Sequence, residues 1–234
     1  MWNRRSWLPG LVLCAASCTS GPGDTASTGP TVQASGHVED AVFGNNVPGA
    51  SVCSVWNECV SSDGDGRFVH PGVPGAAQTH VQVSSEGATP VLAAFETTAA
   101  PIELTPVGLS ESSFVDSFYF LLDTEREPGT GIVAFRVTGD MGGQVGIRAR
   151  LQPTASGPHY TNDNGLPETD RFETGRDGGG VFINVQPGTV ELEHIGLPEG
   201  CQTLLGWGSA DRVSVPVEAD AVTLVRVGCS PAGR

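Results

Sequence analysis

Lysine is absent from this sequence of 234 residues, and its twelve basic side chains are all arginines. This absence excludes catalysis by a lysine amine. The basic residues are also few against 26 acidic ones, which gives a formal net charge of −14. Because a strongly acidic chain is repelled by phosphate backbones and anionic lipid surfaces, we predict that it does not bind nucleic acid.

The sequence also lacks the motifs of the common enzyme classes. It has no Gly-x-Ser-x-Gly, no His-Glu-x-x-His, no P-loop and no dinucleotide-binding fingerprint. Its five histidines show no metal-binding spacing, and its only tyrosines, Tyr119 and Tyr160, do not complete the paired Tyr and His pattern of intradiol dioxygenases. We therefore predict a protein without catalytic activity, without a cofactor and without a metal centre.

Turn-forming residues are abundant, with 32 glycines and 17 prolines, whereas only 16% of the residues are charged. This composition favours many short strands joined by turns over a helical bundle. Residues 79–84 and 145–151 alternate between apolar and polar side chains, which is the period of a half-buried strand. The length suits two units of roughly 100 residues each. We predict an all-β fold of two tandem immunoglobulin- or transthyretin-like β-sandwich domains joined by a short helix.

Residues 1–17 have the form of an export signal, in which Arg4 and Arg5 precede a short apolar stretch that ends in small residues. The stretch is too short to span a bilayer. The small residues before Cys18 resemble a bacterial lipobox, which makes Cys18 the expected site of lipidation and the first residue of the mature chain. Two alternatives stay open, lipidation at Cys14 and secretion without a lipid. Residues 18–34, rich in Gly, Ser, Thr and Pro, are then expected to form a flexible tether.

Four cysteines remain in the mature chain once Cys18 is assigned to the lipid: Cys53, Cys59, Cys201 and Cys229. An even number of cysteines in an exported protein indicates disulfides. Three pairings are formally open, and the pairs Cys53–Cys59 and Cys201–Cys229 keep each bridge within one predicted domain. Zinc binding is the competing interpretation, but the sequence has no Cys-x-x-Cys spacing.

Residues 35–107 are predicted to form the first sandwich. They contain, in order, Gly36-His37-Val38, Pro48-Gly49-Ala50, Asp63-Gly64-Asp65-Gly66-Arg67-Phe68 and Gly87-Ala88-Thr89-Pro90. This series resembles the carboxypeptidase regulatory-like domain, a small transthyretin-like β-sandwich in which the third motif forms a hairpin. The resemblance implies an accessory module and not the catalytic zinc domain of a carboxypeptidase.

Residues 108–128 are predicted to contain the helical connector. Ser110 and Glu111 offer a helix start, and apolar side chains then recur at helical spacing at Phe114, Val115, Phe118, Leu121 and Leu122. Such a stripe is expected to pack against a sheet or between the two domains. Residues 129–230 are predicted to form the second β-sandwich. Their segments 160–167 and 182–188 resemble the second module of tandem lipoproteins from myxobacteria-like organisms.

Two kinds of candidate ligand site follow from the sequence. Trp56 and Trp207, the only tryptophans left after removal of the signal, each lie between two cysteines. A rigid loop that presents an aromatic ring is a common binding design, and the alternative is that each ring fills the edge of a thin core. Oxygen ligands for calcium are offered by Asp63, Asp65, Asn162, Asp163 and Asn164. Neither loop has the downstream Glu of an EF-hand, which favours turn-forming roles for these residues.

These features predict an exported, non-catalytic lipoprotein of the bacterial cell envelope, with the outer membrane as its expected anchor, that acts as a binding or structural module. Secretion to the extracellular space is the other predicted location. The expected partners are the membrane, through the lipid, and an envelope protein or glycan. The alternative function is a carbohydrate- or peptide-binding accessory protein of an envelope enzyme.

Overall fold

The computed structural model describes residues 30–56 and 58–230, which form eighteen strands and one helix. The strands of the first half are β1 (Thr31–Asp40), β2 (Ser51–Ser54), β3 (Cys59–Ser61), β4 (Arg67–Pro74), β5 (Gln78–Ser84), β6 (Val91–Glu96), β7 (Ile102–Glu103) and β8 (Val107–Leu109). The helix is α1 (Ser112–Leu121). The second half contains β9 (Gly131–Gly139), β10 (Gly142–Gly143), β11 (Arg148–Gln152), β12 (Ser156–Tyr160), β13 (Gly179–Val185), β14 (Gly188–Ile195), β15 (Cys201–Leu205), β16 (Trp207–Ser209), β17 (Arg212–Val217) and β18 (Val222–Cys229). The predicted all-β class is confirmed to the extent that the described chain is mostly β-sheet.

The first strand begins earlier than predicted. Thr31 already pairs with Pro74 of β4, and Val32 and Ala34 are buried. Residues 31–34, predicted to end the flexible tether, therefore belong to β1, because their alternate side chains enter the core. The predicted signal, the predicted lipidation site Cys18 and the tether up to residue 29 lie outside the described residues.

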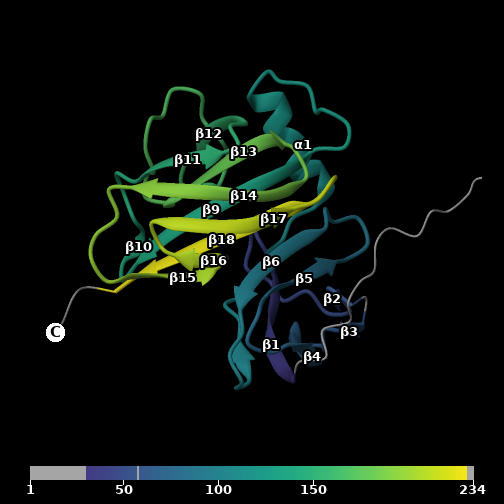
Figure 1. The fold of residues 1–234 in the computed structure, drawn as a ribbon. Coiled ribbons are helices and arrows are strands. Elements are labelled where there is room, and N and C mark those ends of the chain that lie inside the picture. The colour runs from purple at the N-terminus through teal and green to yellow at the C-terminus, as the bar shows by residue number, and fades with distance from the viewer. Residues whose placement is uncertain (1–29, 57, 231–234) are drawn as a thin grey trace, which may run out of the picture.

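One sheet of ten strands runs through both halves of the chain (Figure 1). Its order is β12-β13-β9-β18-β6-β5-β2-β3, with β10 paired to β9 and β15 paired to β18. β18 lies parallel to both β9 and β6, so that Val222 is opposite Ile132 on one side and Val91 on the other. The two regions predicted as tandem sandwiches thus share a sheet, and their arrangement as separate domains is not confirmed.

Each half adds a smaller sheet. The first half contains a sheet of order β4-β1-β7, in which β8 also pairs with β1. The second half contains a sheet of order β11-β14-β17-β16. Each smaller sheet shares a cluster of buried side chains with the large sheet. The first cluster crosses the predicted domain boundary, because it contains buried side chains from the second half, namely Ile132, Val181, Ile183, Leu205 and Val222.

α1 contributes its apolar side to the first cluster. Its buried residues are Val115, Phe118 and Tyr119, and the ring of Phe114 meets that of Phe118 edge-on with centroids 5.2 Å apart. The packing predicted for the apolar stripe is therefore observed for Phe114, Val115, Phe118 and Leu122, whereas Leu121 is 44% exposed. Glu111 is the N-cap residue, so the helix begins where predicted, but the Glu111 side chain makes no capping hydrogen bond. Among the described residues no helix is long and apolar enough to cross a membrane.

Both predicted disulfides are present, Cys53–Cys59 and Cys201–Cys229. Each joins residues directly opposite one another on antiparallel strands, since β2 pairs with β3 and β15 with β18 in these registers. The shorter bridge closes the β2–β3 hairpin. The turn at 63–66, predicted to form a hairpin, instead carries the chain from β3 in the large sheet to β4 in a smaller sheet.

Candidate binding groove

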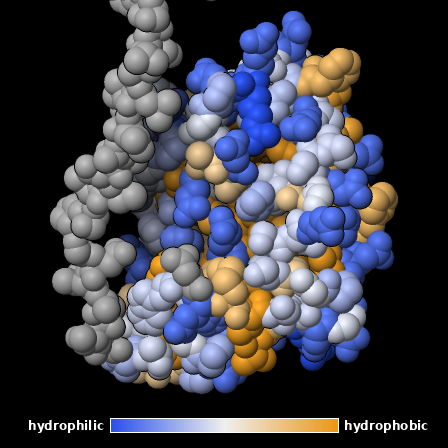
Figure 2. Space-filling model, turned by 90° about the vertical axis from the view of Figure 1, so that its right-hand side faces the viewer, coloured by the Kyte–Doolittle hydropathy of each residue, from blue (hydrophilic) through white to orange (hydrophobic). Residues whose placement is uncertain are grey.

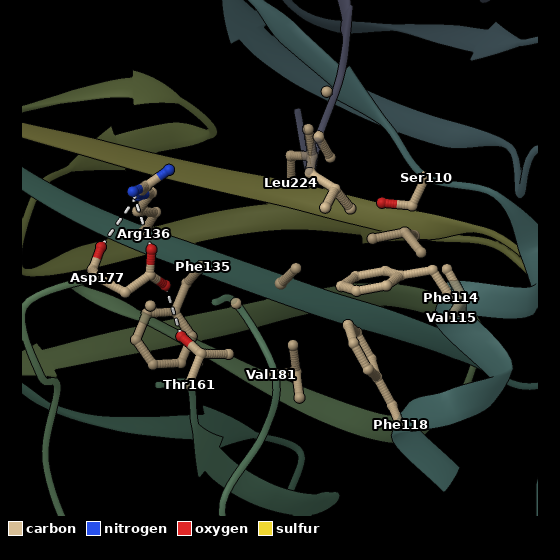
Figure 3. A pocket seen from close by; sticks show the side chains of 18 of the residues that line it. Ser110, Phe114, Val115, Phe118, Phe135, Arg136, Thr161, Asp177, Val181 and Leu224 are labelled. Carbon is tan, nitrogen blue, oxygen red and sulfur yellow. Dashed lines mark hydrogen bonds and ion pairs between the residues drawn. The ribbon is translucent and has the colours of Figure 1, made fainter. Parts of the chain in front are cut away.

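A groove lies on one face of the large sheet, beside α1 (Figure 3). Its volume is about 480 Å³. Ala134 of β9 lies between Val181 of β13 and Leu224 of β18, because it is paired in register with both. These three side chains come from neighbouring strands and form the floor of the groove.

The apolar part of the groove is its end next to the helix. Phe114 and Phe118 extend from α1 over the sheet, and Val181 and Leu224 lie nearby (Figure 3). Phe118 and Val181 are buried, whereas Phe114, Ala134 and Leu224 are half-buried. Three apolar side chains therefore keep contact with solvent inside the groove.

Arg136, Asp177 and Thr161 form a linked group at the other end (Figure 3). Arg136 forms an ion pair with the Asp177 carboxylate at 2.9 Å, and its Nε donates to the Asp177 carbonyl at 3.0 Å. The Thr161 hydroxyl donates to the same carboxylate at 2.7 Å. A Cβ at Gly179 would come within 2.5 Å of Asp177 Oδ2, so β13 can lie this close to the Asp177 carboxylate only with glycine at this position. The Asp177 carboxylate is thus fully engaged and holds Arg136 in place.

Arg226 stands next to Arg136, because the two residues are paired on the parallel strands β18 and β9. Its guanidinium lies 4.0 Å from the Glu39 carboxylate and donates a hydrogen bond of 3.4 Å to Thr105 Oγ1. Burial lowers the pKa of Arg226, Glu39 opposes this shift, and the Arg136 cation adds to it. Arg226 is therefore a half-buried cation with long contacts to its partners.

Two turns with side-chain hydrogen bonds form the rim. Asp40 Oδ1 accepts hydrogen bonds from the backbone N–H groups of Val42 at 2.9 Å and Phe43 at 2.7 Å. The Phe43 side chain is nevertheless 79% exposed. The second turn contains Asp163 and Asn164. Phe43 is one of three strongly exposed phenylalanines in the described chain, with Phe120 and Phe172. The molecular face in Figure 2 is mostly hydrophilic, with apolar residues in separate patches.

The two tryptophans predicted as ligand contacts do not line the groove. Trp56 is half-buried in the turn inside the shorter disulfide loop. Trp207 is half-buried on β16, and its indole N–H donates to the carbonyls of Thr79 at 3.0 Å and Phe95 at 3.2 Å. Trp207 thus joins the second half to β5 and β6, which favours the structural interpretation of this residue.

The turns considered for calcium use their side-chain oxygens locally. Asp63 Oδ1 accepts a hydrogen bond from the backbone N–H of Asp65, and Asn162 Oδ1 accepts one from Asn164, both at 2.9 Å. Within residues 30–56 and 58–230, no three His, Cys, Asp or Glu side chains gather into a group that could hold a metal ion. Asp163 and Asn164 lie instead on the rim of the groove.

Sequence reasoning missed Arg136 and Arg226. One signal was available, since each interrupts a strand of mainly apolar residues in a chain with few basic ones. Their proximity depends on the pairing of β9 with β18, which no local pattern reveals. Together with the floor and the carboxylates of Glu39 and Asp177, they give a groove that is apolar at one end and charged at the other, which suits binding of a ligand.

Comparisons with known proteins identify no family for this chain. No family model and no curated protein matches the sequence. Similar solved structures include the minor pilin of Streptococcus agalactiae, with 11% identity and a TM-score of 0.29 over 87% of this chain and 98% of that one. They also include a streptococcal ancillary pilin, with 16% identity and a TM-score of 0.27 over 89% of this chain and 64% of that one. A shaft pilin of Lactobacillus rhamnosus GG is similar as well, with 8% identity and a TM-score of 0.27 over 88% of this chain and 100% of that one. These TM-scores are too low to carry an argument about fold or function.

Proposed function

We propose that this chain is an exported, non-catalytic module of the bacterial cell envelope, anchored by a lipid on Cys18, that binds another envelope component. The observation that carries the proposal is the pair of disulfides, because such bridges form and persist in oxidising compartments outside the cytoplasm. The export signal expected in residues 1–17 supports the same location. The groove supports binding, because apolar and charged side chains converge there.

We also infer that residues 35–107 are a carboxypeptidase regulatory-like module. Gly36 lies in β1, Ala50 comes directly before β2, and Phe68 lies in β4, so three of the four motifs fall at or next to strands. The third motif departs from the family pattern, because the turn at 63–66 joins two sheets and does not close a hairpin. In this chain the module continues into the second half through the shared sheet, so we expect both halves to act as one body.

Fractionation of the native host tests the anchor. The wild-type protein should sediment with membranes and enter the detergent phase, whereas Cys18→Ser should not. Cys14→Ser is the matched control and should behave like the wild type. A Cys18→Ser protein that still enters the detergent phase would contradict the proposed anchor, and loss of the anchor only in Cys14→Ser would move it to Cys14.

A second candidate function is a carbohydrate- or peptide-binding accessory protein of an envelope enzyme, and the groove is the observation that favours it. This function requires an enzyme partner. Cross-linking in intact cells, followed by mass spectrometry, should then recover one envelope hydrolase with the wild type. Recovery of membrane lipids without any enzyme would argue against this second function.

A further inference from the structure

The Arg226 side chain has hydrogen-bonding capacity that the protein does not use. A guanidinium carries five N–H donors. Among the described residues, Arg226 donates only to Thr105, at 3.4 Å, and Glu39 at 4.0 Å is beyond hydrogen-bond distance. Arg136 already forms an ion pair with Asp177. Of the two arginines that line the groove, Arg226 is therefore the one available to bind an anionic ligand.

The charges around Arg226 favour a ligand with a single negative charge. Asp177 is engaged by Arg136 and Thr161, but Glu39 remains near and Asp163 lies on the rim. A carboxylate matches the planar fork of a guanidinium. A phosphate would match it too, but its second negative charge would add to the repulsion that any anion meets from Glu39.

The end of the groove next to α1 favours an apolar group, although polar side chains such as Thr89 and Ser110 also line the groove. The half-buried side chains Phe114, Ala134 and Leu224 line this end of the groove, away from Arg226. The exposed side chain of Phe43 lies at the rim. These side chains offer no donors or acceptors. A peptide or a sugar lying across this floor would leave polar groups without partners, which is costly, whereas an alkyl chain would not.

We propose that the groove binds an aliphatic carboxylate, with its carboxylate on Arg226 and its alkyl chain on Phe114, Ala134 and Leu224. This inference rests on the proposed function as a binding module and names its ligand. The volume of about 480 Å³ lies within the roughly 300–1,000 Å³ of small-molecule sites.

Calorimetric titration of the purified, disulfide-intact mature protein tests the proposal. The probe is decanoate below its micelle concentration, compared with acetate, which lacks the chain, and decanol, which lacks the charge. Two variants change the groove: Arg226→Gln removes the cation, and Ala134→Leu fills the floor. Their controls are Arg212→Gln, an exposed arginine that contacts Glu191, and Ala219→Leu at an exposed turn.

We expect one decanoate to bind per chain, and acetate and decanol to bind at least about tenfold more weakly. Arg226→Gln and Ala134→Leu should each weaken decanoate binding by about tenfold or more, and the two controls should leave it unchanged. Melting temperatures of all variants identify any that fail to fold, in which case the acetate and decanol comparisons decide.

Three results would overturn the proposal. They are the absence of saturable decanoate binding, equal binding by folded Arg226→Gln and Arg212→Gln, and binding of an acetylated apolar tripeptide or a disaccharide in place of decanoate. None of these results bears on the membrane attachment of Cys18, so failure of this inference can be distinguished from failure of the anchor.

Discussion

The shared sheet predicts that the first half of the chain cannot fold without the second. We consider a fragment of residues 30–128, which keeps β1 to β8 and α1 and removes β9 to β18. β6 loses β18, its parallel neighbour, and becomes an unpaired edge. The first buried cluster also loses every side chain that the second half supplies.

The size of this loss follows from the residues removed from the first cluster, which are Ile132, Val181, Ile183, Leu205 and Val222. Burial of one such side chain stabilises a fold by about 1.5–3 kcal/mol, so their contacts contribute about 7–15 kcal/mol together. The total stability of a typical domain is about 5–15 kcal/mol. The fragment should therefore be unfolded or loosely packed at 25 °C, even with the Cys53–Cys59 bridge intact.

Amide NMR spectra and thermal unfolding would measure this directly. Residues 30–128 should give a poorly dispersed spectrum and no cooperative transition, whereas residues 30–230 should give a dispersed spectrum and a single transition. Refolding the fragment together with residues 129–230 should restore dispersion. A dispersed spectrum from residues 30–128 alone, with a melting temperature near that of the longer chain, would refute the reasoning and restore two independent domains.

Other predictions concern single features of the fold. Trp207→Phe should lower the free energy of unfolding in urea by about 1–3 kcal/mol, because two backbone carbonyls lose the indole donor. Trp56→Phe is the control and should change it by less than about 0.5 kcal/mol. Equal effects of the two variants would contradict the structural role of Trp207. Replacing Cys201 and Cys229 by alanine should lower the free energy of unfolding by about 3.5 kcal/mol, and replacing Cys53 and Cys59 should lower it by about 2.4 kcal/mol, because a bridge that closes a longer loop restricts the unfolded chain more. A larger loss from the shorter bridge would contradict this reasoning. Burial lowers the pKa of His194 below its usual 6.5, against the opposing effects of the Ala210 carbonyl and Asp211. Below that pH the unfolded chain takes up a proton that the folded chain resists, so stability should fall as the pH drops below about 6.5 and should not depend on His194 above it. His194→Asn should flatten this pH dependence of the urea midpoint, and an unchanged slope would contradict it.

Strands with strong alternation were predicted well from the sequence. Residues 79–84 alternate between apolar and polar side chains, and they form β5 with the same alternation of buried and less buried positions. The strand predicted from Val145 begins only at Arg148, because Val145 is 54% exposed and Gly146 has a φ of +84°. β12 and β15 were missed, since their side chains are mostly not buried and give no clear period.

The long-range pairing could not be read from the sequence. β18 resembles an ordinary alternating strand, and nothing in its residues specifies that it lies parallel to β6 and β9. The groove depends on this pairing, because it brings Arg226 beside Arg136 and Leu224 beside Ala134. Cysteines were more informative, since their parity and the expected export predicted disulfides, and the predicted division of the chain favoured the two pairs that the structure contains.

The central claim is that the chain works outside the cytoplasm as an oxidised, lipid-anchored module, and one measurement tests it most directly. The intact mass of the protein from membranes of its own host would be determined with and without reduction and alkylation. We predict a mature chain that begins at acylated Cys18 and in which Cys53, Cys59, Cys201 and Cys229 are alkylated only after reduction. An unmodified N-terminus in the medium would contradict the anchor, and cysteines alkylated without reduction would contradict the oxidised, exported state.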